Sequence, residues 1–83
     1  MHEQEFQIII EQDEDGVFVA EVPGIRGCYA QGDTFEEAMA YIRDVLEMCL
    51  ADMKSRNEEI PRQSEIIGVK RLKVAAELEG SRP

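Results

Sequence analysis

Alternating apolar and polar positions near the start of the chain predict two antiparallel strands. Over residues 5–11 and 17–22, apolar side chains recur at every second position, which is the period of a strand with one buried face. The Asp15-Gly16 step between the two segments is a strong hairpin signal. The pattern therefore predicts a hairpin whose first face holds Phe6, Ile8, Ile10, Phe18, Ala20 and Val22.

After residue 34 the spacing of the apolar residues changes to that of a helix. Steps of four and three predict a helix over residues 35–56 with one apolar stripe. Thr34 and Glu37 fit a capping box, in which a hydroxyl and a carboxylate accept hydrogen bonds from free backbone N–H groups. The predicted stripe consists of Phe35, Met39, Ile42, Leu46, Cys49 and Met53, widened by Ala38, Val45 and Leu50.

Two further segments have the character of strands. Residues 27–32 predict a short strand between glycines, and residues 65–75 predict a fourth strand. The predicted order is β-β-β-α-β, an α+β fold with an antiparallel three-stranded sheet, a fourth strand and one long helix packed on one face. We expect one domain over residues 1–76 and a flexible C-terminal tail over residues 77–83.

A helix can cover only one face of this sheet, yet the other face also carries apolar residues. Ile9, Val17 and Val19 fall on that second face, where a water-facing strand needs no apolar side chains. Tyr41 and Met48 form a smaller apolar ridge on the helix, nearly opposite its core stripe. These five residues are the candidate interface for a partner protein or for self-association. The alternative is that they are scattered surface residues without a binding role.

The charge of the chain restricts the kinds of partner that it suits. Eighteen Asp and Glu residues against nine Lys and Arg residues give a net charge of −9. Such a surface repels phosphate backbones, so direct nucleic-acid binding is disfavoured. The acidity either keeps a small protein soluble or complements a basic partner. Only the C-terminal part is locally basic, through Lys70, Arg71 and Lys73.

The sequence carries no sign of export or of membrane insertion. Its first residues are polar and acidic, unlike those of a signal peptide. No apolar run approaches the about 20 residues that a membrane-spanning helix needs. We therefore expect a cytoplasmic protein that does not associate with membranes.

No pattern in the sequence assembles a catalytic, cofactor or metal site. Cys28 and Cys49 match no zinc-ligand spacing and are interpreted as small core residues, and His2 is the only histidine that could act as a base. No glycine-rich loop has the spacing of a phosphate-binding motif. We therefore expect neither a cofactor nor enzymatic activity. A metal-dependent nuclease that uses carboxylates such as Asp13 and Asp15 is kept as an alternative.

The segment between residues 22 and 38 carries the most specific signal. It reads Pro-Gly, then Gly-Cys, then Gly-Asp-Thr-Phe-Glu-Glu-Ala at the start of the predicted helix. In this order and context it resembles the HicB-type antitoxin domain, and the resemblance extends over residues 4–75. Because the matching residues shape turns and cap a helix, they mark the fold and need not mark the binding site. They are Pro23, Gly24, Gly27, Gly32, Asp33, Thr34 and Glu37.

The resemblance implies a fold, a partner and an assembly. HicB-type domains have a β-β-β-α-β fold described as partial RNase H-like, and they assemble into dimers or tetramers. They bind and occlude HicA toxins, which are small basic ribonucleases that degrade mRNA, and the acidity of this chain agrees with such a partner. An orphan, self-associating HicB-like domain without a toxin is the other alternative. About eight residues follow the predicted fourth strand, too few for the DNA-binding domain of many HicB proteins, so the resemblance does not extend to operon autorepression.

Overall fold

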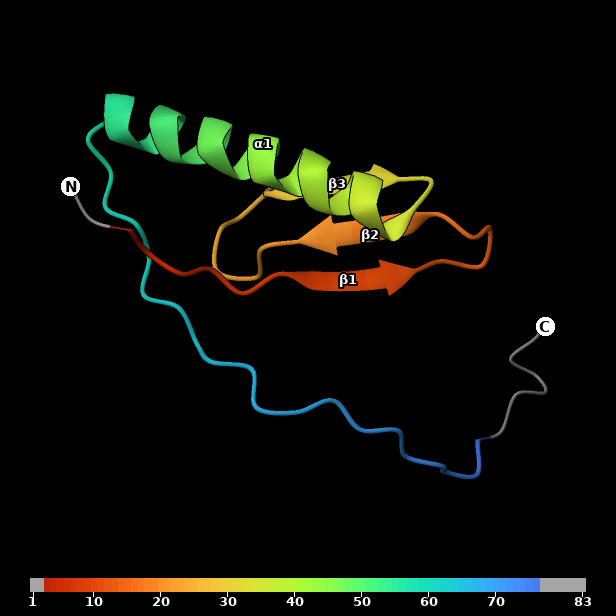
Figure 1. Cartoon of the computed structure of the whole chain (residues 1–83). Coiled ribbons are helices and arrows are strands. Elements are labelled where there is room, and N and C mark those ends of the chain that lie inside the picture. Colours follow the sequence, from red (N-terminus) through yellow and green to blue (C-terminus); the bar gives the residue numbers. More distant parts are fainter. Residues whose placement is uncertain (1–2, 77–83) are drawn as a thin grey trace, which may run out of the picture.

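One helix lies against one face of a three-stranded antiparallel sheet in the computed structural model, which describes residues 3–76 (Figure 1). The strands are β1 (Ile9–Gln12), β2 (Phe18–Glu21) and β3 (Tyr29–Gly32), in the spatial order β1-β2-β3. The helix, α1, spans Phe35–Ser55. The predicted α+β class, the first three strands and the helix are confirmed, although each strand is shorter than predicted. Within residues 3–76, no helix has the length and apolar character of a membrane span.

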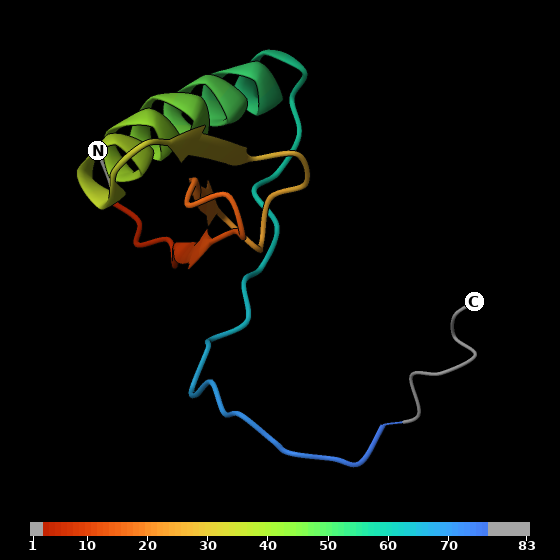
Figure 2. The same cartoon turned by 90° about the vertical axis from the view of Figure 1, so that its right-hand side faces the viewer.

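The strand register determines which side chains face the helix. Ile10, Ala20 and Ala30 are cross-strand partners and so share one face. Ala20 and Val22 have no exposed surface, because this is the face that α1 covers (Figure 2). The predicted first face is therefore confirmed, and its remaining members pack against the core from a half-buried position: Phe6, Ile8, Ile10 and Phe18.

The core lies between this sheet face and α1. Its buried members are Ala20, Val22, Ile25, Cys28, Ala38, Ile42 and Met53, with Val45, Leu46, Cys49 and Leu50 half-buried against them. The predicted helix stripe is wrong at its N-terminal end, where Phe35 is 50% exposed and Met39 is 37% exposed. Phe35 begins the helix, and a helical side chain points back towards the preceding turn. Met39 borders an open groove beside the sheet.

The N-terminus of α1 is fixed by the predicted capping box. The Glu37 N–H donates to Thr34 Oγ1 at 3.0 Å, and the Asp33 N–H donates to Glu37 Oε1 at 2.9 Å. These bonds satisfy free backbone donors at the junction between β3 and α1. Gly32 lies so close to this junction that an added Cβ would stand 2.8 Å from the Ala38 nitrogen and 2.8 Å from Glu37 Cβ.

The substitution Gly32→Ala is expected to lower the free energy of unfolding by about 1–3 kcal/mol, because the helix backbone must move to admit the methyl group. Urea denaturation followed by circular dichroism measures this loss. Gly68→Ala is the matched control, since no atom lies within 4 Å of the Cβ position there. Equal stability of the two variants would show that the junction relaxes without cost.

The predicted fourth strand is not formed in this single chain, in which residues 60–76 form no helix or strand. Residues 64–76, termed the C-terminal arm, extend away from the sheet and helix (Figures 1 and 2). The Cα radius of gyration is 16.6 Å, against about 12 Å for a compact chain of this length. Within the described residues, the strand pairings are those of β1 with β2 and of β2 with β3, and the arm takes part in neither. The predicted tail over residues 77–83 lies outside the described residues.

Residues 3–59 are termed the body. The side chain of Gln7, in the body, forms hydrogen bonds with the start of the arm. The Ile66 N–H donates to Gln7 Oε1 at 2.7 Å, and Gln7 Nε2 donates to the Ser64 carbonyl oxygen. The Gln63 side chain lies against Gly24, where a Cβ would stand 2.6 Å from Gln63 Cγ. Beyond Ile66, none of the hydrogen bonds found in the described residues connects the arm to the body.

Candidate functional site

The sheet face opposite α1 is the first candidate binding surface and is termed the open face. Two cross-strand rows form it, and both mix apolar with polar side chains. The predicted residues Ile9 and Val19 lie in separate rows and are half-buried, and Val17 is half-buried just before β2. The rows are Ile9, Glu21 and Tyr29, then Glu11, Val19 and Gln31.

Tyr29 is the member of the open face that the sequence reasoning missed. It is 65% exposed and stands opposite Glu21 in the sheet. Its neighbour Cys28 is 1% exposed, and successive residues of a strand point to opposite faces. A two-residue period counted from a buried Cys28 was therefore the signal that could have placed Tyr29 on the outside.

Carboxylates give the open face its electrostatic character. Glu11 and Glu21 are exposed among its apolar side chains, and the hairpin turn at its end adds Asp13, Glu14 and Asp15. Exposed charges of one sign beside apolar surface attract a partner of the opposite sign and let it form apolar contacts. The open face therefore suits a basic protein.

The apolar ridge on α1 is a separate surface. Tyr41 is 48% exposed and Met48 is 68% exposed, and Asp44 lies between them on the same side of the helix. The sheet lies on the other side of α1, so the ridge and the open face do not meet. The five predicted interface residues are thus divided between two surfaces.

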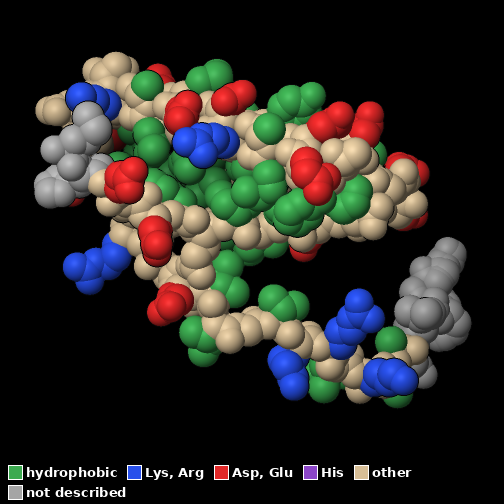
Figure 3. Space-filling view, in the orientation of Figure 1, with side chains coloured by type: hydrophobic (Ala, Val, Ile, Leu, Met, Phe, Trp, Pro, Cys, Tyr) green, Lys and Arg blue, Asp and Glu red, His purple; other side chains and the backbone are tan. Residues whose placement is uncertain are grey.

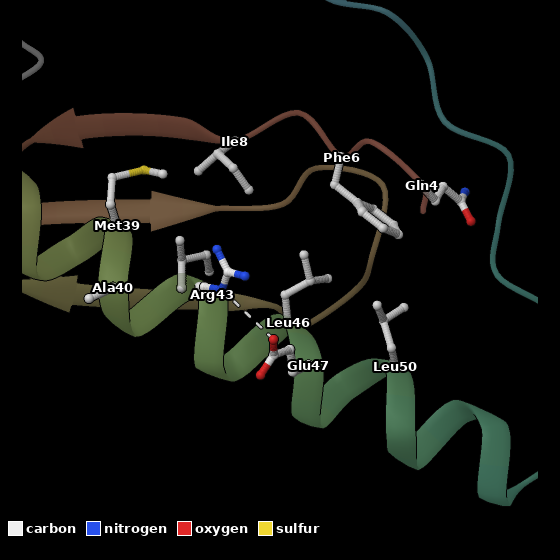
Figure 4. A pocket seen from close by; sticks show the side chains of 10 residues that line it. Gln4, Phe6, Ile8, Met39, Ala40, Arg43, Leu46, Glu47 and Leu50 are labelled. Carbon is white, nitrogen blue, oxygen red and sulfur yellow. Dashed lines mark ion pairs between the residues drawn. The ribbon is translucent and has the colours of Figure 1, made fainter. Parts of the chain in front are cut away.

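A third surface, not predicted from the sequence, is an apolar groove between α1 and the segment that leads into β1 (Figure 4). Its volume is about 580 Å³. Arg43 and Glu47 stand at its rim, with Arg43 Nε 3.8 Å from Glu47 Oε2. The predicted fourth strand was expected to complete the sheet, which is why no opening was foreseen. Apolar side chains line the groove from both sides: Phe6, Ile8, Met39, Ile42, Leu46 and Leu50.

The side chains that could take part in catalysis are buried, are engaged in structural hydrogen bonds, or are not grouped into a site. Among residues 3–76, no three His, Cys, Asp or Glu side chains are grouped so as to hold a metal ion. Burial, assisted by the neighbouring Cys49, raises the pKa of the Cys28 thiol to about 11, so it stays protonated and is a poor nucleophile. The Asp13 carboxylate accepts from the N–H groups of Asp15 and Val17 at 2.9 and 3.0 Å and so holds the hairpin turn. The nuclease alternative gains no support from the described residues.

Comparison with known proteins bears on what these surfaces are for. A family model described as "HicB_like antitoxin of bacterial toxin-antitoxin system" matches residues 6–78. The chain belongs to this family. The UPF0150 protein ssr1258 of Synechocystis sp. is 43% identical over 74 residues, which cover 89% of this chain and 100% of that protein. The UPF0150 protein Ta0767 of Thermoplasma acidophilum is 39% identical over 59 residues, which cover 71% of this chain and 86% of that protein.

In this HicB-like chain the motif residues serve the fold. The loop after β2 is closed by hydrogen bonds from the Val22 N–H to the Cys28 carbonyl at 2.9 Å and from the Cys28 N–H to the Ile25 carbonyl at 3.2 Å. Gly27 has a φ of 76°, which side-chain-bearing residues rarely adopt. Together with the capping box, this loop accounts for the signature without assigning it a binding role. The surfaces that remain for binding are the open face, the ridge and the groove.

Proposed function

We propose that this HicB-like protein is an antitoxin that binds a small basic HicA-like toxin and so prevents it from degrading mRNA in the cytoplasm. Membership of the family supports an antitoxin role and, with it, a toxin as the kind of partner. The observation that carries the finer proposal is the open face, where Ile9, Val19 and Tyr29 lie beside Glu11 and Glu21. Such a surface offers apolar contacts and charge complementarity to a protein that grips RNA.

The open face suits a toxin better than the ridge on α1. A stable interface of standard size covers about 800 Å² on each partner. The open face draws side chains from three paired strands, which hold them at fixed spacings, whereas Tyr41 and Met48 form a narrow strip two helical turns long. We therefore place the toxin on Ile9, Val17 and Val19, and we keep the ridge as the second candidate surface.

Co-expression with the product of the adjacent gene tests the antitoxin role. We expect a small basic protein that copurifies with this chain and that cleaves RNA only when this chain is absent. Titration of the purified toxin with this chain should suppress cleavage at stoichiometric amounts. An adjacent gene that encodes no such protein, or a product that does not bind, would contradict the proposal.

Self-association without a toxin is the second candidate function. The groove beside β1 and the exposed arm favour it, because both leave apolar surface in water. The dimer or tetramer, the fourth strand and the partial RNase H-like relation also belong to this proposal. The fourth strand and the partial RNase H-like relation require residues 65–75 to pair with a sheet edge.

A further inference from the structure

The C-terminal arm holds the most exposed apolar side chains of the described chain. Ile67 is 93% exposed, Val69 88%, Leu72 85% and Val74 71%. Branched apolar residues at this density are typical of strands that pack against other surfaces. A segment that stays exposed to water gains no stability from apolar side chains, so these residues indicate that the arm packs against another surface.

The arm also differs from the body in charge. Residues 3–59 hold fifteen Asp and Glu side chains against four Lys and Arg, whereas the arm, residues 64–76, holds three Lys and Arg against one Glu. Figure 3 shows several basic side chains spread along the extended segment and many acidic ones over the helix and the sheet. Complementary charge therefore favours contact between an arm and a body of this same protein.

The body has an incomplete edge at β1. The spatial order β1-β2-β3 leaves β1 at one edge of the sheet, and α1 packs mainly over β3 and β2. The groove opens on the β1 side, between Phe6 and Ile8 on one wall and Leu46 and Leu50 on the other. A strand added beside β1 would pair with its free backbone groups and direct alternate side chains into this groove.

We propose that two copies of this chain exchange their arms, each arm pairing as a fourth strand with β1 of the other copy and placing Ile67 and Val69 in its groove. The arm can do so because, in the described residues, its hydrogen bonds to its own body end at Ile66. Residues 67–76 reach about 33 Å when extended, enough to cross to a neighbour. Mutual exchange is a closed two-fold arrangement that covers both grooves and both edges at once.

The exchange goes beyond the antitoxin role and does not depend on it. It uses the edge of β1 and the groove on the helix side of the sheet, so the open face stays available to a toxin. Loss of the dimer and loss of toxin binding are consequently separate results in the experiments below.

Light scattering of the full chain at micromolar concentration should report a dimer. The double substitution Ile67→Asp/Val69→Asp should weaken the dimer at least about 100-fold, which gives a monomer at that concentration. Phe35→Asp introduces the same kind of charge at an exposed apolar site of the body, outside the groove and the ridge, and should leave the dimer intact. A monomeric unmodified chain, or a double variant that remains a dimer, would overturn the proposal.

A mixing experiment separates exchange from an arm that folds back on its own body. A spin label is attached at Ala75→Cys in a chain in which Cys49 is replaced by serine, while the buried Cys28 is kept. This chain is mixed with an unlabelled, ¹⁵N-enriched chain, and the amide signals of β1 and its lead-in are followed by NMR. Exchange broadens those signals in the enriched partner. If the signals broaden only when the label and the isotope are in the same molecule, the arm folds back on its own body and the proposal is contradicted.

Discussion

Replacement of Ile42 by alanine is expected to lower the free energy of unfolding by about 3 kcal/mol. Ile42 is 1% exposed and is the largest of the fully buried side chains, in contact with the core formed by Ala20 and Val22. Alanine removes apolar contacts and leaves a cavity that a short sheet and a single helix cannot fully close. A domain of this length has a total stability of about 4–12 kcal/mol, so the loss is a large part of it.

Urea denaturation followed by circular dichroism provides the measurement. Met48→Ala on the same helix is the matched control, because its side chain is 68% exposed and its loss should change the free energy of unfolding by less than about 0.5 kcal/mol. If both variants lost the same stability, the packing of α1 on the sheet would not be the main source of the body's stability.

Reversal of charge on the open face should weaken toxin binding by about 100-fold, which corresponds to about 2.7 kcal/mol. The change is Glu11→Lys/Glu21→Lys. Both carboxylates are exposed on the sheet, so the substitutions leave the core intact while replacing attraction to a basic toxin by repulsion. Isothermal titration calorimetry with the purified toxin, or the concentration needed to suppress RNA cleavage, gives the affinity.

The matched control is Asp44→Lys/Glu47→Lys, which changes the net charge equally but on α1 beside the ridge of Tyr41 and Met48. Among residues 3–76, the ion pair it removes is the exposed one between Arg43 and Glu47, and such pairs contribute little to stability. Equal losses from the two variants would mean that total charge, not the open face, attracts the toxin. A larger loss from the control would move the interface to the ridge.

Local signals were sufficient to predict most of the body. The hydroxyl of Thr34 and the carboxylate of Glu37 accept hydrogen bonds from residues only a few positions away, so the start of the helix can be predicted from the sequence. The two-residue period likewise placed Ile9 and Val19 on the face opposite the helix. These features depend on neighbours along the chain, which a sequence displays directly.

The features that sequence missed depend on contacts between distant segments. The apolar pattern of residues 65–75 shows that they suit a strand, but pairing also requires a free sheet edge within reach. The groove beside β1 and the exposure of Met39 follow from the same missing neighbour. Tyr29 is the exception, because its position next to the core residue Cys28 would have placed it on the outside by the two-residue period.

The order of elements along the chain has a consequence for biosynthesis. The sheet and α1 are formed by segments that follow one another directly, so their contacts span short stretches of sequence and favour rapid folding. Ribosomes add about 5–20 residues each second, and the C-terminal arm is therefore made after the residues of the body. The body can thus fold by itself, whereas the proposed joining of two copies has to wait until the edge of β1 and the groove have formed.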